Sequence, residues 1–122
     1  MVRSLIERLQ ASGILNDDRY AEGKAASLRR RGGSVRSIRA ALATRGIVGD
    51  LAERAIQSAD EESGVQEPDL AAAQRLAQRR RLGPWRPKGR AEYRMKDIAA
   101  LGRAGFSYEI ACAVIDAEVE ER

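Results

Sequence analysis

A short motif of a leucine, a glycine and a following apolar residue recurs in this chain and constrains its fold more than any other feature; besides the two copies that follow, Leu9-x-x-x-Gly13-Ile14 has the same spacing. Its copies are Leu42-x-x-x-Gly46-Ile47 and Leu101-x-x-x-Gly105-Phe106, 59 residues apart. The same offset aligns apolar positions further along, pairing Leu51 with Ile110 and Ile56 with Ile115. A self-similar spacing of this kind indicates that one small structural unit is built more than once.

Every periodic segment has helical spacing, and none alternates as a strand does. Ser34 and Ser107 are placed to cap helices, and Pro68 suits a first helical turn. Asp50 and Glu53 have the spacing of a capping box. Met95, Ile98, Ala99 and Gly102 are expected to form the apolar stripe of the helix that follows the Pro-Trp loop.

We therefore predict an all-α fold of tandem three-helix repeats in an elongated, curved array, which is either right-handed or left-handed. Residues 1–14 are expected to be the last helix of a preceding repeat, so that two full repeats follow it. The first full repeat is placed at residues 15–62 and the second at 68–122, with a Pro-Trp loop at 83–90 that regular helix cannot include. The stretch at 60–67 is acidic and polar, which predicts a linker. We place the linker between the two repeats at residues 63–67.

The composition argues against an enzyme. The chain has no histidine and one cysteine, and it lacks a glycine-rich phosphate loop, which removes histidine acid–base catalysis and most zinc sites. We expect no metal, cofactor or small-molecule substrate. No segment has the apolar length of a membrane span or the pattern of a signal peptide, so a cytoplasmic location is expected.

Positive charge is local, because the net charge is only +4. Seven basic residues and no acid lie between Lys24 and Arg45, and the same is true between Leu70 and Ala91. The helix dipole explains one arginine near a helix end, but not three in a row. We therefore expect an unneutralised basic binding surface. Its candidate residues are Arg29, Arg30, Arg31, Arg36, Arg39, Arg79, Arg80, Arg81, Lys88, Arg90, Arg94, Lys96 and Arg103.

Three further side chains matter to this interpretation. Trp85 lies among basic residues, where it either stacks on a base or an interface, or folds back over its own loop. Phe106 occupies a repeated apolar position and is expected in the core. Cys112 is expected to be a small core residue rather than a nucleophile.

Several of these motifs together resemble the RecX family of bacterial recombinase regulators. They are Gly13-Ile-Leu-Asn-Asp-Asp-Arg-Tyr-Ala21, Arg31-Gly32, Ile38-Arg39-x-x-Leu42-x-x-x-Gly46-Ile47, Arg79-Arg80-Arg81 and Lys96-x-x-x-x-Leu101-x-Arg103-x-Gly105-Phe106-Ser107-Tyr108. Two departures are visible: most of the family's first repeat is absent, and Ala104 stands where a second basic residue is expected.

The resemblance implies a non-enzymatic protein that binds RecA and its filament on single-stranded DNA, and limits filament growth, ATP hydrolysis and strand exchange. Direct contact with the DNA is left open. Two alternatives remain: a general module for single-stranded nucleic acid without recombinase specificity, and a helical scaffold for another acidic protein. The sequence leaves the relative orientation of the two repeats undetermined.

Overall fold

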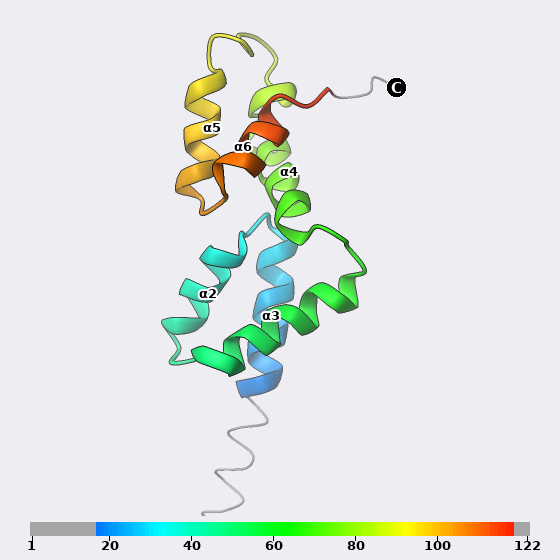
Figure 1. The fold of residues 1–122 in the computed structure, drawn as a ribbon, viewed down its shortest axis with the longest axis vertical. Helices are drawn as coiled ribbons and strands as arrows, with labels where there is room; N and C mark the ends of the chain where they lie inside the picture. Colours follow the sequence, from blue (N-terminus) through cyan, green and yellow to red (C-terminus); the bar gives the residue numbers. More distant parts are fainter. Residues whose placement is uncertain (1–16, 119–122) are drawn as a thin grey trace, which may run out of the picture.

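The computed structural model describes residues 17–118, and within that range the regular structure is helical throughout (Figure 1). A first helix covers residues 17–30. It is followed by α2 (Val35–Ala43), α3 (Gly49–Ser63), α4 (Pro68–Arg80), a short 3₁₀ helix η1 (Gly83–Trp85), α5 (Arg94–Arg103) and α6 (Tyr108–Ile115). The all-α prediction is confirmed by these six α-helices. The helix expected at residues 1–14 lies outside the described residues.

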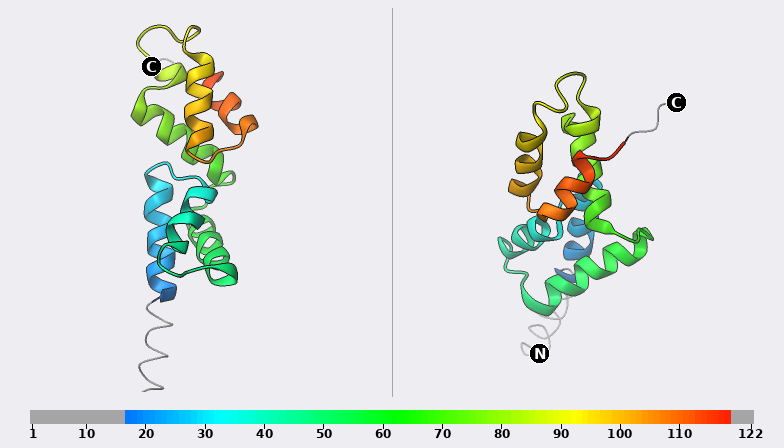
Figure 2. Two further views of the ribbon diagram at one scale, coloured as in Figure 1. Left: turned by 90° about the vertical axis from the view of Figure 1, so that its left-hand side faces the viewer. Right: turned by 45° about the horizontal axis from the view of Figure 1, so that its top comes forward.

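The helices form two bundles, each around its own apolar cluster. The first bundle consists of helix 17–30, α2 and α3, and its most deeply buried large side chains are Ile38 and Leu42. The second consists of α4, η1, α5 and α6, around Leu101, Val114 and Ile115. The two bundles are stacked along the long axis of the molecule (Figure 2).

Three predicted helix starts are confirmed. Ser34 precedes α2 and its Oγ accepts a hydrogen bond from the Ser37 amide; Ser107 does the same for α6 through the amide of Ile110. Pro68 opens α4. The predicted Asp50–Glu53 capping box does not form, because α3 begins at Gly49, two residues earlier than an Asp50 N-cap requires, and its N-cap Val48 makes no side-chain hydrogen bond.

The end of α3 corrects the expected linker. The acidic stretch was expected to be irregular from residue 60, yet α3 continues through Asp60 to Ser63. Gly64 ends it at φ 73°, a left-handed conformation that glycine adopts without steric cost. Asp60 therefore lies on a rigid helix, where it takes part in packing.

The buried face of α5 also differs from the prediction. Met95 is 61% exposed, and Ala99 and Gly102 are exposed as well. The side chains that face inward are Asp97, Ile98 and Leu101. Relative to the prediction, α5 is rotated about its axis so that Asp97 faces inward, where it accepts hydrogen bonds from Gly83 and Arg86. An acidic residue therefore occupies a buried position, although the sequence pattern assigns it to the surface.

Phe106 is buried in the second cluster at 4% exposure, as predicted. Cys112 is half-buried and packs against the same cluster. None of the described helices is both long and apolar enough to cross a membrane. Within residues 17–118, no three histidine, cysteine or acidic side chains gather in an arrangement that could hold a metal ion.

Candidate functional site: an arginine-lined groove between the bundles

Three adjacent arginines at the end of helix 17–30 have three different environments. Successive residues of an α-helix point about 100° apart, so a run of three cannot share one face. Arg29 is buried at 8% exposure, whereas Arg30 and Arg31 are exposed. The run is thus divided between the interior and the surface.

Arg29 is held inside the protein by carboxylates from two other helices. Its Nε and Nη2 donate to the two carboxylate oxygens of Asp60, each at 2.9 Å. Its Nη1 donates to Asp69 and to the backbone oxygen of Gly33. Desolvation lowers the pKa of Arg29, but hydrogen bonds with Asp60 and Asp69 more than offset it and raise the pKa above its ordinary value.

The expectation that Arg29 belongs to an unneutralised binding surface is therefore wrong. Its charge is balanced by Asp60 and Asp69, which lie 31 and 40 residues away along the chain. Arg29 instead ties the first bundle to the start of α4.

A shallow groove collects the exposed members of the two arginine runs. Its lining residues are Leu28, Arg31, Gly32, Gly33, Ser37, Leu76, Arg79, Arg80 and Ala104. Arg31 comes from the first bundle, and Arg79 and Arg80 from the last turn of α4 in the second. No carboxylate lines the groove, and among the described residues none of these three arginines forms an ion pair with an acid. Positive charge is thus concentrated on this surface.

The joint between the bundles fixes the groove through polar contacts. Asp69, in the first turn of α4, accepts a 2.8 Å hydrogen bond from the amide of Val35 at the start of α2. Ser34 Oγ donates to the backbone oxygen of Ala104 at 2.9 Å, and Arg75 Nη1 donates to that of Arg29 at 3.0 Å. Helix ends of one bundle therefore satisfy polar groups of the other.

Two glycines allow the bundles to approach each other closely. Gly32 has φ 93°, and a Cβ there would lie 2.9 Å from the Cβ and the amide nitrogen of Leu76 in α4. Gly105 has φ 101°, and a Cβ there would clash with Ser34 Oγ. These contacts fix the relative orientation of the bundles, which the sequence left open.

Arg36 and Arg103 lie beside this joint. Arg36 is exposed in the first turn of α2, next to Gly105. Arg103 is exposed at the end of α5, adjacent in sequence to Ala104 of the groove lining. Arg81 is the C-cap of α4, with φ 57°, and does not line the groove.

Other candidates are occupied by contacts within the protein. Arg39 forms a bidentate pair with Glu53 of α3 at 2.7 and 3.0 Å, and hydrogen bonding raises the pKa of Arg39 and lowers that of Glu53. Arg94 pairs in the same way with Asp116, which raises the pKa of Arg94. The prediction that these two arginines are unneutralised is wrong.

The basic residues around the Pro-Trp loop are scattered. Arg90 donates hydrogen bonds to the backbone oxygens of Ile115 and Ala117, and its side chain thereby caps the C-terminus of α6. Lys96 lies over the ring of Tyr93, 5.7 Å from its centroid. Lys88 is exposed in the loop. None of them lines the groove.

Trp85 is half-buried in η1 and packs against the apolar cluster of the second bundle. Of the two alternatives drawn from the sequence, this position supports the one in which it folds back over its own loop.

Several residues that build the site went unnoticed in the sequence. Asp60 falls in the stretch predicted as a linker, and Arg75 is not among the candidate residues drawn from the sequence. Asp97, at 1% exposure, accepts hydrogen bonds from the amide of Gly83 and from Arg86. Burial raises its pKa, but the bonds from Arg86 and Gly83 prevail and lower it. Asp97 lies off the apolar stripe predicted for this segment, so no sequence signal marked its burial.

Together these features define an all-α protein whose two helical bundles meet at an arginine-lined groove. No family model and no solved structure matches the chain. Two curated proteins do, and both are named regulatory protein RecX. The one from Myxococcus xanthus (strain DK1622) is 44% identical over 117 residues, covering 94% of this chain and 60% of that protein. The one from Agrobacterium fabrum (strain C58) is 34% identical over 108 residues, covering 88% of this chain and 54% of that protein.

The chain belongs to the RecX family, which confirms the resemblance drawn from its motifs. It spans little more than half the length of the curated relatives that it matches.

Proposed function

We propose that this chain is a non-enzymatic regulator that binds the RecA filament on single-stranded DNA and inhibits its ATP hydrolysis and strand exchange. The observation that carries the proposal is the meeting of Arg31 with Arg79 and Arg80 in one groove without a lining carboxylate. Membership of the RecX family supports the choice of partner. Because that partner works on bacterial DNA, we propose a cytoplasmic location.

The chemistry of the groove suits an acidic filament surface. Arginine presents a planar fork of donors that matches carboxylate and phosphate oxygens, and it remains charged at any physiological pH. Arg36 and Arg103, at the edge of the same joint, extend the proposed contact surface. Arg29, Arg39, Arg90 and Arg94 are left out because their donors are engaged within the protein.

We also propose that the two bundles are tandem repeats, with boundaries near 15–62 and 68–122, in a curved array. Their helix starts support this: α2 and α5 begin at residues 35 and 94, and α3 and α6 at 49 and 108. Both pairs share the 59-residue offset of the sequence motif. The Pro-Trp loop is the insertion that separates α4 from α5.

A charge reversal tests the groove. We expect the double variant Arg31→Glu/Arg80→Glu to need about tenfold more protein, or more, for half-inhibition of RecA ATP hydrolysis on single-stranded DNA. Each lost charge-assisted hydrogen bond is worth about 1.5–3 kcal/mol, and tenfold corresponds to about 1.4 kcal/mol. Reversal near a helix end costs under about 1 kcal/mol of stability, so helical content measured by circular dichroism should persist.

The matched control is Arg19→Glu/Arg54→Glu, which makes the same charge change at two exposed arginines that do not line the groove. It should inhibit like the unchanged protein. Equal inhibition by the groove variant and the control would remove the groove from the contact surface.

Titration of labelled single-stranded DNA with and without RecA separates this proposal from a general nucleic-acid-binding module. A general module binds the strand alone, with log affinity falling against log salt by about 0.7 per phosphate neutralised. A filament regulator gains affinity when RecA is present. A scaffold for another acidic protein binds neither.

A further inference from the structure

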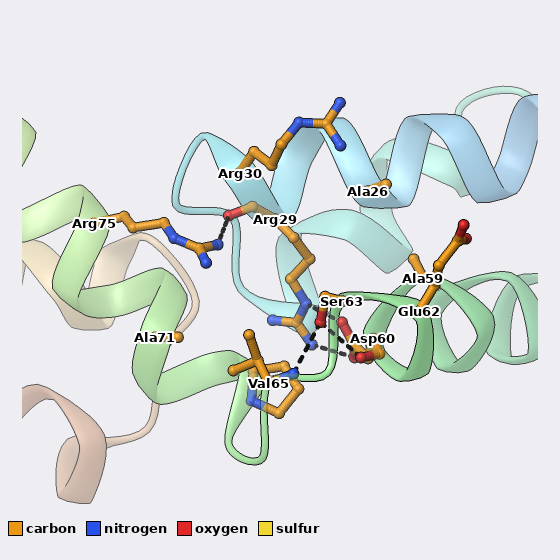
Figure 3. Close-up of a pocket in the computed structure, with 11 residues that line it drawn as sticks. Ala26, Arg29, Arg30, Ala59, Asp60, Glu62, Ser63, Val65, Ala71 and Arg75 are labelled. Atoms are coloured by element: carbon orange, nitrogen blue, oxygen red, sulfur yellow. Dashed lines mark hydrogen bonds and ion pairs between the residues drawn. The ribbon is translucent and has the colours of Figure 1, made fainter.

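A second concave site lies on another side of the joint, and nothing in the proposed groove contact uses it. It is a pocket of about 450 Å³ between helix 17–30, the end of α3, the connection at 64–67 and the start of α4 (Figure 3). Its lining residues are Ala26, Arg29, Arg30, Ala59, Asp60, Glu62, Ser63, Val65, Pro68, Ala71 and Arg75.

The apolar part of the pocket lining consists of small residues. Ala26, Ala59 and Ala71 come from three different helices, and Val65 and Pro68 close the side formed by the connection. Hydrogen bonds within the turn hold this wall in place: Ser63 Oγ donates to the backbone oxygen of Asp60, and the amide of Val65 donates to Ser63 Oγ. The result is an apolar depression large enough for one or two bulky side chains.

The charge around the depression is positive on one side. Three arginines and two acids line it: Arg29 is paired with Asp60 and with Asp69, and Glu62 of α3 adds a negative charge to the lining. Arg30 and Arg75 remain at the rim, and among the described residues neither forms an ion pair with an acid. Arg75 bonds to the backbone oxygen of Arg29, which leaves its charge uncompensated (Figure 3). An apolar group whose nearby carboxylate faces Arg30 and Arg75, and not Glu62, therefore complements this site.

The lining favours a protein side chain over a nucleobase. Single-stranded nucleic acids bind through aromatic platforms on which bases stack, and none of the lining residues is aromatic. An aliphatic or aromatic side chain of a protein needs only apolar contact of the kind that the alanines, the valine and the proline provide.

The pocket and the arginine groove are continuous along α4. Arg75 lines the pocket and Arg79 lines the groove, four residues apart on one helix, so their side chains are neighbours on its surface. A single acidic segment following α4 can therefore contact the groove with its carboxylates and the pocket with an apolar side chain.

We propose that the pocket receives a bulky apolar side chain, flanked by a carboxylate, from an acidic protein segment of the filament. This inference rests on the proposed function and adds the protein-specific part of the contact. The groove supplies positive charge, to which any polyanion can bind. The pocket, in contrast, distinguishes a protein partner from bare nucleic acid.

Two variants test the pocket. Ala71→Phe fills it from a half-buried position on α4, and Arg30→Glu reverses the charge at its rim. Their controls are Ala99→Phe on the exposed face of α5 and Arg54→Glu on α3. The readouts are half-inhibition of RecA ATP hydrolysis on single-stranded DNA, and binding of the same labelled strand without RecA. Thermal melting of each variant checks the fold.

We expect both pocket variants to weaken inhibition by about tenfold or more, as the loss of one buried apolar anchor or one charge contact implies. Both controls should inhibit normally, and affinity for the bare strand should not change. Normal inhibition by folded pocket variants would overturn the inference and leave the groove proposal intact. If Ala71→Phe does not fold, Arg30→Glu decides alone. If the unchanged protein does not inhibit RecA, both proposals fail together.

Discussion

Replacing Arg29 by alanine should destabilise the whole chain rather than weaken binding alone. Its side chain is 10% exposed, and its partners Asp60 and Asp69 are 19% and 23% exposed. The substitution removes the hydrogen bonds to both carboxylates and to the backbone oxygen of Gly33. It leaves two acids facing each other around an empty space.

The magnitude follows from that burial. Breaking a fully buried ion pair by removing one partner costs about 3–5 kcal/mol, because the remaining charge stays desolvated. Here the remaining carboxylates are partly exposed and can recruit water, so we expect a loss of about 2–3 kcal/mol in the free energy of unfolding. A single domain has only about 5–15 kcal/mol in total.

Urea denaturation followed by circular dichroism measures the effect. With a urea dependence of about 1–3 kcal/mol per molar, Arg29→Ala should lower the unfolding midpoint by about 1 M or more. Arg54→Ala is the matched control, because Arg54 is exposed and makes one long 3.4 Å hydrogen bond to the Asp50 backbone oxygen. Its effect should stay within about 0.5 kcal/mol.

A loss below about 1 kcal/mol for Arg29→Ala would refute the reasoning. It would mean that Asp60 and Asp69 do not depend on this arginine, and Arg29 would return to the list of candidates for filament contact. High salt gives a further check, because a partly buried pair is screened less than surface charges, and the difference between Arg29→Ala and the unchanged protein should persist.

The remaining predictions concern the joint and the acid response. Gly32→Ala should cost more stability than Gly46→Ala in urea denaturation: both glycines have positive φ, but an added Cβ meets α4 only at Gly32 and nothing within 4 Å at Gly46. Equal losses would show that the close approach of the bundles is not limiting. The folded-state pKa of Asp97 is lowered, so its contribution to stability is present above the unfolded-state pKa of about 3.9 and is lost as the pH falls through the lower folded value. The unfolding free energy of Asp97→Asn should therefore fall less between pH 5 and pH 2 than that of the unchanged protein, and parallel curves would contradict the assigned partners Arg86 and Gly83.

Local rules were sufficient for most helix boundaries. Ser34, Ser107 and Pro68 act through hydrogen bonds or backbone angles set within three or four residues, so their roles can be read from the sequence. Phe106 was also predictable, because a large apolar residue at a repeated position has little alternative to burial. The capping box predicted at Asp50 was wrong because α3 begins two residues earlier than that spacing requires.

The candidate site was predictable in outline but not residue by residue. Counting charges along the sequence identified both arginine runs, and residues from each run line the groove. It could not find the partners of Arg39 and Arg94, because Glu53 and Asp116 lie 14 and 22 residues away and approach only when the helices pack. The orientation of α5, with Asp97 inside, depended on packing in the same way.

The sequence by itself determined the helical class, the doubled motif and the two concentrations of arginine, because periodicity, capping and local charge depend on neighbouring residues. Only the tertiary structure decided which arginine of the first run is buried. Asp60 and Asp69 neutralise Arg29 from two other helices, while Arg31 joins Arg79 and Arg80 from α4 on the surface. The reason is the helix itself: adjacent side chains point in different directions, and the elements packed around them determine which charges meet acids and which remain exposed.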